Sequence, residues 1–209
     1  MRNIKILKIK SINSLIINKH LIMDCKKMLE EYGVVKLLFN KIIIKEEMIK
    51  LAICFGKPRK IKHLLADRKN NVINVINKNG KRRSVFGDIW HSDHAYEKMS
   101  PNYTLIHCPV IPPYGGDTLF SFNEESYNIF FKKYGSIYDN ATIVNTIPNE
   151  TEKLLKLKYQ NLTSIETSCQ KPLVKSINGK NVFTCNRYHT IASKQKDTRI
   201  DEIILENIF

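Results

Sequence analysis

The chain of 209 residues carries 34 lysines and arginines against 20 aspartates and glutamates, a formal net charge of +14. Hydrophobic residues make up 43% of it, and no apolar run approaches the roughly 20 residues of a membrane-spanning helix, which excludes an integral membrane protein. Five cysteines are widely spaced, without a CxxC pair, and read as reduced thiols. We therefore expect one cytoplasmic domain, residues 1–209.

The first part of the chain alternates strand and helix patterns. Apolar periodicity predicts, in order, a strand over 4–9, a helix over 21–32, a strand over 34–39 and a helix over 45–55. Gly33 and Gly56 follow the two helices at the positions where glycine commonly ends a helix.

The middle of the chain is rich in loop residues. We predict a strand over 71–76, strands over 104–110 and 118–122 around a Pro-Pro-Tyr-Gly-Gly-Asp turn, and a helix over 123–134. Asn123 is the expected N-cap of that helix, and Gly135 its stop signal.

The last part combines a hairpin with helical patterns. Asn178-Gly179 is a strong hairpin signal and predicts two strands, 172–177 and 180–185. Helices are expected over 150–159 and 198–209.

The positive charge raises the possibility of a nucleic-acid partner, because a basic surface attracts phosphate. The densest basic stretch, residues 78–83, has no interleaved aromatic side chain of the kind that stacks on bases. It is more typical of a solvated loop, and we do not expect nucleic-acid or membrane binding.

A His and an Asp stand two positions apart in Trp90-His91-Ser92-Asp93. On an extended chain such side chains point to the same face, so His91 and Asp93 can grip one cation. Imidazole nitrogen and carboxylate oxygen together suit iron(II). The spacing alone is unspecific, since an ordinary surface His–Asp pair has the same pattern.

The surrounding sequence makes the pattern specific. The Trp90–Asp93 stretch and the later Pro112-Pro113-Tyr114-Gly115-Gly116-Asp117-Thr118-Leu119-Phe120 resemble two segments of the taurine dioxygenase (TauD/TfdA) family, WHTD and PP-x-GGDT-L-[FW], at similar separation. The Gly33-Val34-Val35 region and the hairpin around Asn178-Gly179 also resemble that family, so the resemblance covers nearly the whole chain.

The resemblance implies an α+β fold with a double-stranded β-helix (jelly roll) core and flanking helices. It implies iron(II) bound by two His and one carboxylate, with His91 and Asp93 as two of the ligands. Thr118 would hydrogen-bond the co-substrate 2-oxoglutarate, and Trp90 would line the substrate pocket beside the metal or pack in the core. Such an enzyme uses O2 to oxidise a small organic acid and releases succinate and CO2.

The family's third ligand, a His, and its Arg anchor for 2-oxoglutarate have no counterpart before Phe209. We therefore expect a shortened chain that lacks the final strands. His189 is not favoured as a replacement ligand and is interpreted as a polar residue after a strand. A non-catalytic remnant or binding module of the same fold is the alternative, taurine is not favoured as substrate, and the oligomeric state stays open.

Overall fold

The computed structural model describes residues 4–59, 89–148, 152, 167–195, 198–199 and 208. The chain divides into two compact units. The first comprises residues 1–60, 68–71 and 103–119, and the second comprises residues 61–67, 72–102 and 120–209. Each unit is described by itself.

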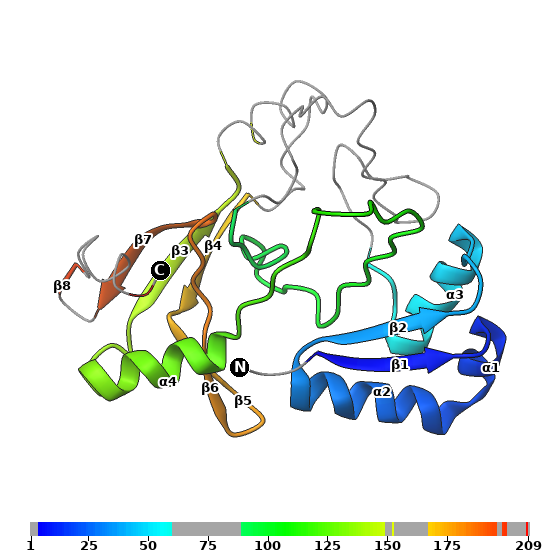
Figure 1. Cartoon of the computed structure of the whole chain (residues 1–209). Coiled ribbons are helices and arrows are strands. Elements are labelled where there is room, and N and C mark those ends of the chain that lie inside the picture. The colour runs from blue at the N-terminus through cyan, green and yellow to red at the C-terminus, as the bar shows by residue number, and fades with distance from the viewer. Residues whose placement is uncertain are drawn as a thin grey trace. The chain divides into compact units, whose positions relative to one another are not determined.

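The first unit combines a small parallel sheet with three helices. Its elements are β1 (Lys5–Ile9), α1 (Ile12–Ile17), α2 (Lys19–Tyr32), β2 (Val35–Phe39) and α3 (Lys45–Phe55). Strands β1 and β2 pair in parallel, with α2 beside them (Figure 1). The four predicted elements of this part are confirmed, while the short helix α1 was not predicted.

Local signals explain where these helices begin and end. Helix α1 starts in a capping box, in which the Ser11 side chain accepts from the Ser14 N–H and the Ser14 hydroxyl accepts from the Ser11 N–H. Helix α2 ends at Gly33, whose φ of 74° is a conformation that glycine adopts without a steric penalty. The core of this unit consists of seven buried side chains: Ile9, Ile12, Leu15, Ile22, Cys25, Ile43 and Leu51.

The strands predicted over 104–110 and 118–122 are wrong. These residues lack regular secondary structure, although burial alternates from Tyr103 to Cys108 as it does along an extended chain. A strand exists only when another segment completes its hydrogen-bond ladder, and none of the described residues does so here. Apolar alternation alone therefore overpredicted strand.

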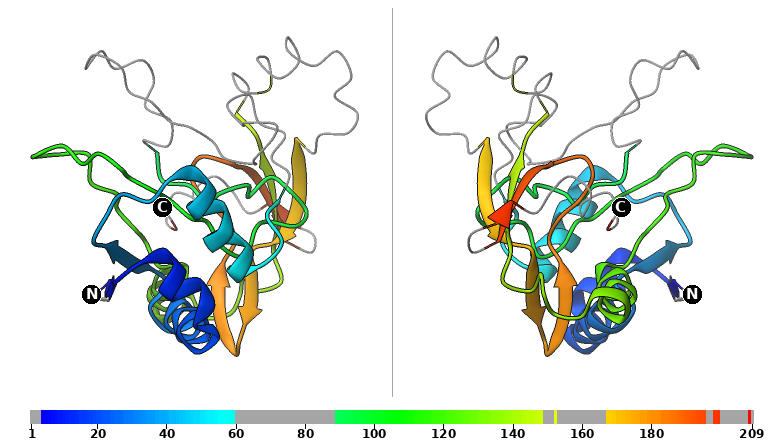
Figure 2. Two further views of the ribbon diagram at one scale, coloured as in Figure 1. Left: turned by 90° about the vertical axis from the view of Figure 1, so that its right-hand side faces the viewer. Right: turned by 90° about the vertical axis from the view of Figure 1, so that its left-hand side faces the viewer.

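The elements of the second unit with described bounds are a helix and six strands. They are α4 (Asn123–Tyr134), β3 (Thr142–Thr146), β4 (Ser168–Pro172), β5 (Val174–Ile177), β6 (Lys180–Phe183), β7 (Thr190–Gln195) and β8 (Thr198–Arg199). An antiparallel sheet has the order β4-β3-β7-β8, and its first three strands lie side by side in Figures 1 and 2. Strands β3, β4 and β7 were not predicted as such.

Strands β5 and β6 form a separate antiparallel hairpin, the orange pair of arrows in Figure 2. Asn178 and Gly179 occupy its turn with φ values of 51° and 75°, which confirms the predicted Asn-Gly hairpin. Helix α4 packs along β6. Both contribute to the apolar cluster of this unit, which consists of Tyr127, Phe130, Ala141, Ile143, Leu173, Phe183 and Cys185.

Two predictions at the ends of helices need correction. Asn123 is the first residue of α4 rather than its N-cap, because its side-chain amide instead donates to the Phe183 carbonyl at 2.9 Å. Thr198–Arg199, the start of the predicted last helix, is a strand because it pairs with β7. Gly135 ends α4 with a φ of 65°, as predicted.

The fold is a mixture of helices and strands, as predicted, and the sheets formed by the described residues do not close into a barrel. The predicted strand over 71–76, the basic stretch 78–83 and, except for residue 152, the predicted helix over 150–159 lie outside the described residues. No helix in the described part of the chain has the length and apolarity to cross a bilayer. None of the five cysteines, all of which lie at described positions, forms a disulfide.

Candidate functional site

His91 and Asp93 lie in the second unit, where irregular backbone leads into a turn over residues 93–96. We expected an extended chain here, and Asp93 instead begins the turn. The two side chains nevertheless converge, with His91 Nε2 3.4 Å from Asp93 Oδ1. Their side chains are 26% and 44% exposed, so both are open to solvent.

A backbone contact orients the His91 ring. Its Nδ1 lies 2.7 Å from the Ile89 carbonyl oxygen, and since a carbonyl only accepts, Nδ1–H donates. The hydrogen bond to Asp93 raises the pKa of His91, the Ile89 contact adds to this increase, and burial opposes it. The Asp93 carboxylate therefore favours a positive charge beside Nε2. A cation bound to the pair would lie at the same place.

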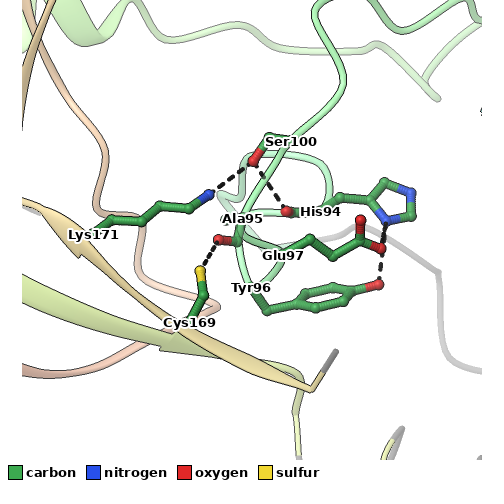
Figure 3. A network of polar contacts seen from close by, with 7 residues as sticks. All are labelled: His94, Ala95, Tyr96, Glu97, Ser100, Cys169 and Lys171. Atoms are coloured by element: carbon green, nitrogen blue, oxygen red, sulfur yellow. Dashed lines mark hydrogen bonds and ion pairs between the residues drawn. The ribbon is translucent and has the colours of Figure 1, made fainter. Parts of the chain in front are cut away.

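The turn that follows His91 is tied to the sheet (Figure 3). The Ala95 carbonyl accepts from the Cys169 thiol at 3.5 Å, and Ser100 Oγ accepts from Lys171 Nζ at 2.8 Å while donating to the His94 carbonyl. His94 has a φ of 53°, a left-handed conformation uncommon outside glycine. The contacts from β4 hold the backbone of this turn.

Rings from two distant segments meet beside His91. Tyr188 lies 5.9 Å from His91 and 4.9 Å from His189, and Tyr96 lies 5.3 Å from His189 and 5.8 Å from His94, measured between ring centroids. Three imidazoles and two phenols thus form a continuous chain of rings. We did not predict a role for either tyrosine, since only the fold brings residues 91–96 and 188–189 together.

His189 is 5% exposed, and its Nδ1–H donates to the Thr146 carbonyl at 2.8 Å. Burial lowers the pKa of His189, and the nearby His91 and His94 lower it further, while the Thr146 contact and Asp93 oppose the shift. His189 is therefore a neutral buried imidazole held by the sheet.

The two remaining predicted residues differ in position. Trp90 precedes His91 and is 53% exposed, so it is not packed in the core. Thr118 is exposed and belongs to the first unit, after Gly115 and Gly116, whose φ values of 72° and 75° confirm the predicted glycine turn. Its role toward 2-oxoglutarate stays a prediction.

The donor set fits a divalent cation in part. His91 offers a ring nitrogen whose partner nitrogen is bound to a backbone carbonyl, the usual arrangement for a metal-ligating His, and Asp93 offers a carboxylate beside it. Within the described ranges, no third His, Cys, Asp or Glu completes a group with these two. The pair supplies two of the ligands that such a centre requires.

Comparison with known proteins gives two findings. The family described as "Taurine catabolism dioxygenase TauD, TfdA family" matches residues 14–203. A protein of Aspergillus oryzae named "Alpha-ketoglutarate-dependent dioxygenase oryG" is 30% identical over 82 residues, which make up 39% of this chain and 24% of that relative. The aligned stretch thus spans about a quarter of the relative's length.

Proposed function

The chain belongs to the TauD/TfdA dioxygenase family, and on this premise we propose that it is an iron(II)- and 2-oxoglutarate-dependent dioxygenase acting on a small organic acid. We also propose that its strands belong to the jelly-roll core that this family implies. The observation that carries the proposal is the convergence of His91 Nε2 and Asp93 Oδ1 to 3.4 Å.

His91 and Asp93 have distinct tasks in this proposal. Because the Ile89 carbonyl holds Nδ1–H, the neutral ring of His91 carries its lone pair on Nε2, the atom nearest Asp93, and a cation would replace the proton that Asp93 favours there. The Asp93 carboxylate neutralises part of the cation's charge. When bound, iron(II) with 2-oxoglutarate and O2 supplies the oxidising chemistry, with succinate and CO2 as co-products.

Thr118 is the proposed contact to 2-oxoglutarate. Its hydroxyl can donate to a carboxylate, and the residue is exposed after the Gly115–Gly116 turn. Trp90, half exposed next to His91, is proposed as a wall of the substrate pocket.

The test measures metal binding and turnover separately. Anaerobic titration with Fe(II) gives the dissociation constant of the metal. Succinate release from added 2-oxoglutarate, compared with and without O2, gives the rate of the oxygen-dependent reaction. His91→Ala and Asp93→Ala should each weaken Fe(II) binding by more than about 100-fold, because even changes behind a ligand cost about 10- to 100-fold. Ser92→Ala, between the two ligands, is the matched control and should bind as wild type does.

The outcome decides between enzyme and binding module. Wild-type metal binding without succinate release would favour a non-catalytic member of the fold. Equal Fe(II) affinity in wild type, His91→Ala and Asp93→Ala would contradict the metal assignment itself. Thr118→Val should raise the KM for 2-oxoglutarate, and Thr118→Ser, which keeps the hydroxyl, should restore it.

A further inference from the structure

Asn145 is a fully buried amide on the central strand of the sheet. It is 0% exposed, and the pairing of β3 with β7 shifts register between Val144, opposite Ala192, and Asn145, opposite Thr190, which leaves one extra residue on β7 as in a β-bulge. Bulges bend a strand and redirect side chains, and they are frequent beside active sites. A buried amide also costs free energy unless its donors and acceptor are used.

The hydrogen bonds of Asn145 reach two other segments. Its Nδ2 donates to the Ala95 carbonyl and to the Thr184 carbonyl, each at 3.4 Å, and its Oδ1 accepts from the Thr190 hydroxyl at 2.6 Å. The 3.4 Å bonds are long and individually weak, whereas the Thr190 bond is short. One side chain thus joins the turn after Asp93 to the turn that leads into β7.

Both turns carry rings of the site. Ala95 lies between His94 and Tyr96, while Thr190 follows Tyr188 and His189. The second turn is closed by Asn186, whose Oδ1 accepts from the His189 N–H and whose own N–H donates to Thr190 Oγ1, both at 3.0 Å. A displacement at Asn145 would therefore move both segments that contribute rings to the chain that includes His91.

We infer that Asn145 is a positioning residue, which fixes the segment from Trp90 to Tyr96 and the turn from Asn186 to Thr190 in the register that the proposed metal pair requires. Asn145 touches neither His91 nor Asp93 in this inference and acts through Ala95 and Thr190. The part that concerns metal binding rests on the proposed function, whereas the positioning of the segment does not.

Trp90 makes the two parts separable, since it is the one tryptophan of the chain and directly precedes His91. Its fluorescence anisotropy and acrylamide quenching in metal-free protein report the order of this segment. Co(II) binding, followed by absorption, reports the metal pair. The full chain is used throughout, at a temperature where every variant is folded.

Four variants carry the test. Asn145→Leu keeps the branched side-chain shape and removes the amide, and Thr190→Val keeps the shape and removes the hydroxyl that donates to Asn145 Oδ1. Thr190→Ser restores that hydroxyl. Ile143→Ala, on the same strand and equally buried, is the control for a loss of stability without loss of a polar contact.

We expect Asn145→Leu to lower Trp90 anisotropy, to increase quenching and to weaken Co(II) binding by about 10- to 100-fold. Thr190→Val should do the same to a smaller extent, and Thr190→Ser and Ile143→Ala should match wild type. If Asn145→Leu does not fold, the two Thr190 variants decide.

Suppose that the wild-type protein does not bind Co(II), but Asn145→Leu still changes the Trp90 signal. This result would support the positioning role and refute the proposed metal site. An unchanged Trp90 signal in both Asn145→Leu and Thr190→Val would overturn the inference. So would an equal change in Ile143→Ala, because the effect would then follow stability alone.

Discussion

Strand β3 places Ile143 and Asn145 on one face of the sheet, both fully buried, yet their surroundings differ. Ile143 packs in the apolar half of the second unit, with side chains such as Phe130 and Leu173. Asn145 lies in the polar half, where its neighbours are hydrogen-bonded backbone and the Thr190 hydroxyl. Over a distance of two residues along one strand, the interior of the unit changes from apolar packing to directed polar contacts.

The difference assigns a task to each half. Apolar contacts have no preferred direction, so the cluster around Ile143 stabilises the unit over a range of side-chain arrangements. Hydrogen bonds depend on distance and angle, so the contacts around Asn145 define where two turns lie. We therefore expect substitutions in the apolar half to change stability, and those in the polar half to change the site as well.

The largest effect is expected from Phe130→Ala in the apolar half. Phe130 is 6% exposed, and its ring lies 4.5 Å from Tyr134 and 5.4 Å from Phe183. Removal of a buried aromatic ring costs about 3–5 kcal/mol of unfolding free energy, measured by urea denaturation. Ile129→Ala, the adjacent residue at 71% exposure, should stay within about 0.5 kcal/mol of wild type.

Phe130→Ala also tests the division between the halves. Trp90 anisotropy should stay at the wild-type value in the folded variant. A change in anisotropy as large as that of Asn145→Leu would mean that the apolar half also positions the Trp90 segment. It would contradict the division of tasks between the two halves.

An intermediate effect is expected at Cys185, the last residue of the apolar half. Burial raises the pKa of the Cys185 thiol to about 12. In the unfolded chain a thiol titrates near pH 8.5, so between these values the unfolded state releases a proton that the folded state keeps. Stability should fall as pH rises, by up to about 1.4 kcal/mol per pH unit.

The measurement compares the pH slopes of unfolding free energy in wild type and Cys185→Ala between about pH 9 and 10.5. Since the variant has no thiol at this position, its slope should be shallower. Parallel slopes would show that Cys185 titrates alike in both states, and hence that this edge of the cluster is open to water.

The smallest effect is expected at the surface of the apolar half. Lys180 Nζ lies 3.2 Å from Glu124 Oε2, with side-chain exposures of 48% and 20%. Exposed ion pairs contribute about 0–1 kcal/mol and are screened by salt. Lys180→Met should therefore cost less than about 1 kcal/mol in urea denaturation, and high salt should abolish the difference; a cost that persists in salt would point to packing of the lysine stem instead.

Elements with local causes were predicted well. Helix α3 follows from apolar periodicity over residues 45–55, and the hairpin follows from Asn178 and Gly179, since the turn needs positive φ at both positions. The strands over 104–110 and 118–122 were wrong and β3, β4 and β7 were missed, because a strand depends on a partner that is distant in sequence.

The sequence by itself determined the family, through the Trp90–Asp93 and Gly115–Thr118 motifs, and it determined which two side chains converge, because His91 and Asp93 are near neighbours. Only the tertiary structure decided the role of Asn145. Its partners Ala95 and Thr190 lie 50 and 45 residues away, and no local pattern encodes a contact over such separations. Short-range geometry is a property of the chain, whereas a buried hydrogen-bond hub exists only once the sheet has formed.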